Sequence, residues 1–261
     1  MLKKYILLLL SCILASNAFA IDINFEKMFN NKTGCFILYD LTTNKSVIGY
    51  GEKQCATRIS PCSTFKIPLA LMAFDQGIFK NEDEIIKWDG VDRGSTDWNK
   101  DQTPKTWLQY STVWVSQWLT PQLGVAKTAY YLNNFQYGNN DMSGGITQFW
   151  LGSTLKISGN EQLIFLKRLW QNQLAVSDFA VNTTKKALYA EKSEIGSILY
   201  SKTGSGFSND NRIGWLVGYL FYNNHNYIFV TNFTSKENSK ISAGQEARDI
   251  TKQIIHELDL W

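Results

Sequence analysis

Apolar runs near both ends of the chain predict the strands of one sheet. Near the N-terminus, residues 34–41 form such a run, and a polar turn at 42–45 leads into a returning segment over 46–50. Three further runs near the C-terminus have the same character, and they cover 196–205, 212–222 and 227–233. Short polar turns between neighbouring runs favour antiparallel pairing.

The region between these strands has the spacing and end signals of helices. One helix is expected to begin near Ser63 and to continue through an almost purely apolar run at 67–74, as a helix buried on all sides would. Thr103 and Pro104 supply the N-cap and first position of another helix, which runs to Tyr110. The remaining helices are predicted to be a short one that closes at Trp118, and others at 120–133, 158–173, 178–192 and 242–258.

Strands at both ends with helices between them indicate an α+β fold. We expect an antiparallel sheet built from both chain termini, flanked by helices and carrying an inserted all-helical region. The 261 residues, 44% hydrophobic and 19% charged, suit one globular domain with a sizeable core. No repeat, low-complexity tract or linker divides the sequence.

Residues 1–20 have the features of a secretory signal peptide. Lys3 and Lys4 give a basic start, an apolar run follows over 5–14, and Ala18-Phe19-Ala20 offers small residues for cleavage. The apolar run is too short for a good membrane span. We therefore expect a mature chain of 21–261, a single domain without a stable membrane anchor, secreted to the periplasm. A weak likeness of 9–12 to a lipoprotein cleavage box leaves a lipid-anchored form as the alternative.

Charge and histidine content exclude several classes of function. Removal of Lys3 and Lys4 lowers the formal charge from +3 to about +1, and no basic stripe remains to bind nucleic acid. The two histidines, His225 and His256, lie in a polar turn and in the last predicted helix, and both are expected to face solvent. A Ser-His-Asp triad or a His-rich zinc site therefore lacks its residues, and no metal is expected. The sequence indicates no particular oligomeric state.

Three cysteines remain in the mature chain: Cys35, Cys55 and Cys62. An odd number leaves at least one unpaired in an oxidising compartment. Cys35 and Cys55 bracket the first predicted hairpin and are the favoured pair, although three buried free thiols are an equally good interpretation. Cys62 has no base among its neighbours and is therefore not expected to be a nucleophile.

The tetrad Ser63-Thr64-Phe65-Lys66 at the start of the buried helix is the main chemical signal. One helical turn separates Ser63 from Lys66, so that a hydroxyl and an amine can project from the same edge. A helix N-terminus also offers unpaired N–H groups and a positive dipole end. A hydroxyl nucleophile, an amine and N–H donors are the requirements of an acyl-transfer site.

Ser-x-x-Lys alone is a weak signal, because about one match is expected by chance in a chain of this length. Residues 153–156 match it equally well, but no buried helix follows them. The first copy is supported by Lys202-Thr203-Gly204 on a downstream predicted strand. Ser-x-x-Lys and Lys-Thr-Gly occur together in penicillin-recognising enzymes.

The ordered motif set resembles that of the class D, oxacillinase-type serine β-lactamases. The matching motifs are Ser63-Thr64-Phe65-Lys66, Ser111-Thr112-Val113, Tyr137-Gly138-Asn139, Trp150 and Lys202-Thr203-Gly204. The resemblance covers essentially the whole mature chain and implies the fold shared by serine β-lactamases and penicillin-binding-protein transpeptidases. The class A relatives carry Ser-Asp-Asn in place of the second motif, which favours class D.

The resemblance implies a role for each matching residue. Ser63 would attack the lactam carbonyl of a penicillin-type antibiotic, and Lys66 would take up CO2 or bicarbonate as N6-carboxylysine, the general base. Trp150 would donate a hydrogen bond to that carbamate. Ser111 would relay a proton to the leaving nitrogen. Read without the family, Trp150 is an ordinary core aromatic and Ser111 a helix cap.

The substrate-binding residues are implied in the same way. Val113 would form part of the pocket wall, and the backbone N–H groups of Ser63 and Ser205 would form the oxyanion hole. Lys202-Thr203-Gly204 and Arg248, which matches the carboxylate-binding arginine of the family, would contact the substrate carboxylate. A lone arginine on a helix is otherwise usually solvated. Tyr137 and Asn139 are expected to structure their loop.

Two other interpretations of the same residues stay open. A β-lactam sensor domain of this fold would acylate but deacylate slowly, and a penicillin-binding transpeptidase would usually bring an anchor and further domains. A catalytically inactive secreted scaffold is a remote third. The cleavable signal and the lack of spanning helices in the sequence favour the secreted hydrolase.

Overall fold

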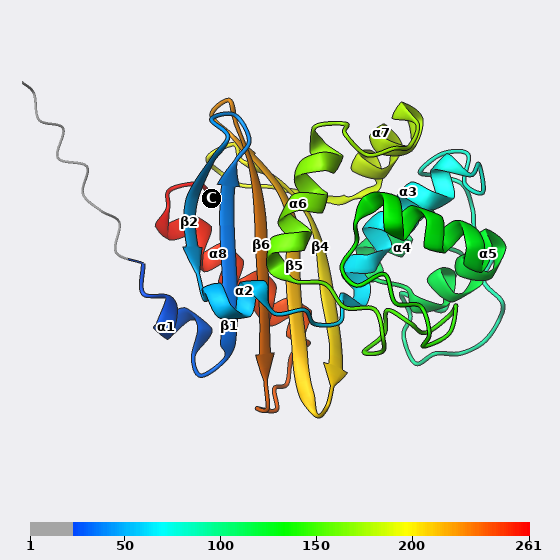
Figure 1. Cartoon of the computed structure of the whole chain (residues 1–261), viewed down its shortest axis with the longest axis horizontal. Coiled ribbons are helices and arrows are strands. Elements are labelled where there is room, and N and C mark those ends of the chain that lie inside the picture. The colour runs from blue at the N-terminus through cyan, green and yellow to red at the C-terminus, as the bar shows by residue number, and fades with distance from the viewer. Residues whose placement is uncertain (1–22) are drawn as a thin grey trace, which may run out of the picture.

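The computed structural model describes residues 23–261, and the predicted signal peptide lies outside them. Its centre is a six-stranded antiparallel sheet in the order β2-β1-β6-β5-β4-β3 (Figure 1). The strands are β1 (Thr33–Asp40), β2 (Lys45–Tyr50), β3 (Tyr189–Lys192), β4 (Ile198–Ser208), β5 (Asn211–Tyr222) and β6 (His225–Ser235). This order confirms the predicted sheet built from both termini, because β1 pairs along its whole length with β6.

Apolar side chains alternate between the two faces of the sheet and form two separate cores. On β5, Trp215 and Val217 point into the larger core, and Leu216 points into the smaller one. Such alternation follows from the two-residue period of a strand. A sheet that is apolar on both faces needs cover on both sides, and the helices supply that cover.

Helices cover both faces of the sheet, and a helical region extends beyond β4 (Figure 1). Helix α8 covers one face, α2 and α6 pack on the other, and α3, α4, α5 and α7 form the helical region, to the right in Figure 1. The helices are α1 (Phe25–Phe29), α2 (Glu52–Ala56), α3 (Lys66–Asp75), α4 (Pro104–Tyr110), α5 (Val113–Phe135), α6 (Gly159–Trp170), α7 (Asp178–Ala187) and α8 (Ala243–Glu257), with a 3-10 segment η1 (Cys62–Phe65). Within residues 23–261, no helix has the length and apolar character of a membrane span.

The predicted helix ends at Thr103 and Ser158 are confirmed by their caps. Each cap side chain accepts a hydrogen bond from the backbone N–H three residues further along the chain. The side chain of that third residue accepts a hydrogen bond from the backbone N–H of the cap residue. Such a reciprocal capping box satisfies two of the free donors of a helix N-terminus.

Several elements differ from the sequence prediction. The predicted helix 178–192 ends at Ala187, and residues 189–192 form β3, because the chain becomes extended at Leu188 and pairs with β4. The break predicted before Thr120 is instead at Gly124, whose φ of 75° interrupts an otherwise continuous α5. The five-residue helices α1 and α2 were not predicted, since they are too short for a periodic signal.

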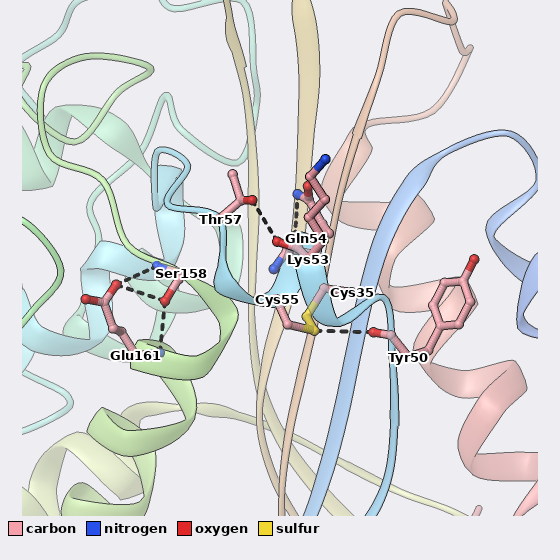
Figure 2. The surroundings of a disulfide bond; sticks show 9 residues. Cys35, Tyr50, Lys53, Gln54, Cys55, Thr57, Ser158 and Glu161 are labelled. Atoms are coloured by element: carbon pink, nitrogen blue, oxygen red, sulfur yellow. Dashed lines mark hydrogen bonds between the residues drawn. A yellow bond between two sulfur atoms is a disulfide. The ribbon is translucent and has the colours of Figure 1, made fainter.

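The favoured cysteine pair is confirmed: Cys35 on β1 and Cys55 on α2 form a disulfide (Figure 2). Gly51 makes the turn between β2 and α2, and its φ is 70°. A Cβ at this residue would lie 1.8 Å from the Gly34 carbonyl oxygen. Only glycine fits this approach. Cys62 is a buried free thiol.

Candidate active site

Ser63 and Lys66 lie together where η1 passes into α3. Lys66 is fully buried and its Nζ donates to Ser63 Oγ at 3.3 Å, while Ser63 keeps 8% of its surface exposed. The chain enters this segment through Cys62, whose φ of 49° is left-handed. Such a conformation costs a non-glycine residue on the order of 1 kcal/mol or more, and it is typical of functional sites. The structure therefore places a hydroxyl at the rim of the core and an amine beneath it.

The Lys66 amine is held in an environment that disfavours its charge. Burial lowers the pKa of Lys66 to about 7, and the nearby Cys62 raises it only in part. Desolvation penalises the charged form of a lysine, so the neutral amine becomes accessible near neutral pH. A neutral amine carries the free electron pair that a base or a nucleophile towards CO2 requires.

Trp150 packs against Phe65 of the same tetrad and has an indole N–H without an acceptor in the described part of the chain. The side chain is fully buried and its ring stacks on that of Phe65 with centroids 5.3 Å apart. Among residues 23–261, no atom accepts a hydrogen bond from Trp150 Nε1. A buried donor without a partner costs about 1–3 kcal/mol, so an acceptor at this position would be strongly favoured.

Ser60 fixes the position of Trp150, although no motif in the sequence indicates this residue. Its Oγ donates to the Trp150 carbonyl at 2.8 Å and accepts from the Gly152 N–H at 2.9 Å. The Ser60 carbonyl accepts from Trp215 Nε1 on β5 at 2.9 Å. One residue thus ties the segment before η1 to the Trp150 turn and to the sheet.

Ser111 and Lys202 join the helical region to β4. Ser111 closes α4 in a left-handed conformation with φ 56°, and its Oγ accepts a hydrogen bond from Lys202 Nζ. Lys202 also donates to the Thr203 carbonyl at 3.1 Å. Burial, with the positive charges of Lys66 and Arg248, lowers the pKa of Lys202 well below its usual value. The second and fifth motifs therefore meet in space, although 91 residues separate them.

The glycines of β4 permit its close contact with η1. A Cβ at Gly204 would lie 3.0 Å from the Pro61 carbonyl oxygen, and one at Gly206 would lie 2.5 Å from Cys62 Sγ. β3 pairs with β4 only as far as Ser201, so that β4 runs on from Lys202 as an edge strand. A strand edge offers free backbone donors and acceptors to a ligand.

Ser205 lies on the edge of β4, and Val113 lies at the start of α5. Ser205 is exposed, and its Oγ accepts from the Gly244 N–H at the start of α8 at 2.7 Å. Val113 begins α5 and is half-buried. The first turn of α8 is thereby fixed beside the edge of β4.

Arg248 was predicted to bind the substrate carboxylate, but its guanidinium contacts a carboxylate of the protein itself. Its guanidinium forms an ion pair with Glu191 on β3 and lies over the ring of Tyr189 at 5.4 Å. Glu191 was not predicted as a site residue, because it falls within a segment whose pattern indicated a helix, where a lone carboxylate is usually solvated.

Tyr137 and Asn139 pack and hydrogen-bond within their loop region, and the second Ser-x-x-Lys tetrad, residues 153–156, lies outside any helix. Asn139 Nδ2 donates to the Thr154 carbonyl at 2.9 Å, and Tyr137 is fully buried with its ring 5.9 Å from that of Phe65. Ser153 and Lys156 lie in an irregular segment before α6, which begins only at Gly159. Only the tetrad at Ser63 has the geometry of a nucleophile with a buried amine.

Comparison with known proteins agrees with this geometry. Residues 29–256 match the penicillin binding protein transpeptidase domain family. Beta-lactamase OXA-1 of Escherichia coli is 39% identical over 242 residues, which cover 89% of this chain and 87% of that protein. The regulatory protein BlaR1 of Staphylococcus aureus is 33% identical over 234 residues, covering 89% of this chain but only 39% of BlaR1.

Solved structures show the same fold. The crystal structure of the class D β-lactamase from Bacillus subtilis superposes with a TM-score of 0.83 at 33% identity, covering 92% of this chain and 97% of that one. A class D β-lactamase from Sebaldella termitidis gives a TM-score of 0.85 at 29% identity, with 92% and 97% covered. Family, sequence relatives and structures thus agree, and the chain belongs to the class D serine β-lactamases, a family of hydrolases with a penicillin-binding transpeptidase fold.

Proposed function

We propose that this protein is a secreted β-lactamase that hydrolyses the lactam amide of penicillin-type antibiotics through a Ser63 acyl-enzyme, with carboxylated Lys66 as general base. One observation carries the proposal: the fully buried Lys66 amine lies 3.3 Å from Ser63 Oγ, in a core that also contains the unpartnered indole N–H of Trp150. The absence of a histidine base from this cluster is consistent with a lysine-derived base.

The residues around Lys66 fit a carbamate. A neutral amine reacts with CO2 by forming a C–N bond and releasing a proton, and burial makes that neutral form available near pH 7. A carbamate supplies a negatively charged oxygen that accepts a proton. Trp150 Nε1 is the donor suited to hold it, because a buried charge without a partner is strongly disfavoured.

Acylation then follows from the positions of the other residues. The Ser63 hydroxyl proton moves toward the Lys66 side chain while Ser63 Oγ attacks the lactam carbonyl carbon, and the N–H groups of Ser63 and Ser205 stabilise the oxyanion. The C–N bond of the lactam breaks, and Ser111 relays to the nitrogen the proton that Ser63 gave to the Lys66 side chain, so that both Ser111 and the base are restored. Lys202 donates to Ser111 Oγ, which orients that hydroxyl and assists loss of its proton.

Hydrolysis of the acyl-enzyme separates an enzyme from a sensor domain. The base beside Ser63 must take a proton from water after acylation, so it must stay charged while the substrate covers it. Relatives of this chain include both β-lactamases and a regulatory protein. The decisive quantity is therefore the number of turnovers, not acylation alone.

Steady-state hydrolysis of nitrocefin or oxacillin by purified 21–261 tests the proposal. We expect many turnovers per molecule, a loss of activity in CO2-depleted buffer, and recovery with added bicarbonate. Since the pKa of Lys66 is about 7, protonation should make the loss larger at about pH 6 than at about pH 8. Activity indifferent to bicarbonate would leave the neutral amine of Lys66 as base, and one equivalent of product followed by arrest would indicate a sensor.

Ser63→Ala is the matching control for the nucleophile. Intact-mass spectrometry after penicillin treatment should show an adduct on the parent protein and none on this variant. An adduct that persists in the variant, or that maps to Ser153, would contradict the assignment of Ser63.

A further inference from the structure

Glu191 is a nearly buried carboxylate that faces two cations of α8. Its Oε1 pairs with the Arg248 guanidinium, and its Oε2 lies 2.8 Å from Lys252 Nζ. The Glu191 side chain is 17% exposed and that of Arg248 19%. At this burial an ion pair is only weakly screened by solvent, so the Arg248 charge is largely compensated.

The position of Arg248 on α8 connects this pair to the edge of β4. Gly244, Arg248 and Lys252 follow at intervals of four and lie along one face of the helix. At Gly244 a Cβ would lie 3.1 Å from Thr203 Cβ and 2.7 Å from Ser205 Oγ, so this face rests directly on the edge of β4. Glu191 sits further along, opposite Leu199 of β4.

Thr203 and Ser205 thus lie about one turn of α8 from Arg248, toward the helix N-terminus. Helical side chains lean toward the helix N-terminus, which for Arg248 is the direction of Gly244 and Thr203. The Arg248 charge already lies near enough to Lys202 to lower the pKa of that amine. In the structure the guanidinium instead contacts Glu191, on the adjoining strand.

We propose that Glu191 is a specificity-determining residue that holds the Arg248 guanidinium on β3 and so weakens recognition of the substrate carboxylate. The inference rests on the proposed function, since it assumes that a carboxylate substrate binds along Lys202 to Ser205. It assigns carboxylate binding in the unmodified protein chiefly to Lys202 and Thr203. A substrate carboxylate competes with Glu191 for Arg248, because both offer the same planar pair of oxygens.

Glu191→Gln tests the inference, because it removes the charge and keeps the side-chain shape. We expect KM for benzylpenicillin to fall roughly fivefold with kcat unchanged, the equilibrium factor carried by a modest ion pair. In the Glu191→Gln background, Arg248→Gln should remove the whole gain.

Matched controls separate this effect from a general change of charge. Glu194→Gln removes the same charge three residues away from an exposed side chain, and KM should not change. Lys252→Gln leaves Glu191 with Arg248 alone, and KM should stay equal or rise. A penicillin methyl ester has no carboxylate, so its acylation rate should be the same for Glu191→Gln and the parent.

Several results would overturn the inference. These are an unchanged or higher KM for Glu191→Gln, an equal gain with the methyl ester, or a gain that persists without Arg248. If the protein acylates without turning over, the same variants are compared by the second-order acylation rate from intact-mass spectrometry. Failure of the hydrolase proposal then leaves the Glu191 comparison intact.

Discussion

Trp150 combines two contributions that a substitution can separate. Its ring fills the core against Phe65 and Phe149, with centroids 5.3 and 5.0 Å away. Its indole N–H has no acceptor among the residues described. Loss of the ring would open a cavity and destabilise the protein by roughly 3–5 kcal/mol, whereas loss of the N–H alone should affect chemistry.

Trp150→Phe should therefore acylate normally and deacylate slowly. Phenylalanine retains an aromatic ring beside Phe65 but provides no donor to the charged base. Stopped-flow measurement should show a burst of about one equivalent followed by a steady rate lower by on the order of 10-fold or more. Trp170→Phe, in which the replaced ring stacks on Tyr219 of the sheet, is the matched control and should behave as the parent. Normal turnover of Trp150→Phe would reduce Trp150 to a packing residue.

The sequence alone predicts proximity only for residues that are close along the chain. Ser63 and Lys66 are one turn apart, so any helical conformation brings them close. Lys202 meets Ser111 only through the fold, and the family motif order was needed to pair them. The Arg248–Glu191 pair was missed because it depends on a strand that the local pattern does not reveal.

At the scale of elements, the errors arise where tertiary contacts override local preference. Residues 189–192 carry a helical pattern but complete the sheet, since β4 offers them an unpaired edge. The Gly124 break is a backbone property of one residue inside an apolar pattern that continues across it. Both strands of the first hairpin and all three strands of the last meander were predicted, because their apolar runs and polar turns are local.

The Cys35–Cys55 disulfide anchors α2 to β1, and its loss should affect stability more than catalysis. It closes a loop of 20 residues, for which the unfolded-state constraint is about 3 kcal/mol. Cys35→Ala/Cys55→Ala should therefore unfold at lower denaturant concentration. β6 and β5 separate β1 from β4 in the sheet, so kcat/KM for nitrocefin should stay within about twofold.

The single and double variants provide the control for that experiment. Cys35→Ala and Cys55→Ala each break the same bond, and each should cost nearly as much as the double variant. Additive losses from the two single variants would show that the bond contributes little and that packing of the two side chains accounts for the stability.

At the scale of the whole molecule, two hydrophobic cores share one sheet. The larger core joins the helical region to one face, and the smaller core joins α8 and α1 to the other. The candidate active site lies where η1, α4 and β4 meet, so its geometry depends on both the sheet and the helical region. Composition and element order predict this arrangement in outline, while the contacts between η1 and β4 depend on Gly204 and Gly206.

Secretion and the disulfide make a joint prediction for the whole chain. Protein expressed with residues 1–20 and recovered from the periplasm should begin at Ile21, and the oxidising compartment should form the Cys35–Cys55 bond. Alkylation after denaturation should then label one cysteine, Cys62. Protein made in the cytoplasm without residues 1–20 should have three labelled cysteines and a Tm lower by roughly 10 °C. Intact mass gives both the number of alkylated cysteines and the position of the N-terminus. Three labels on periplasmic protein would contradict the disulfide bond, and a mass that retains residues 1–20 would contradict the signal peptide.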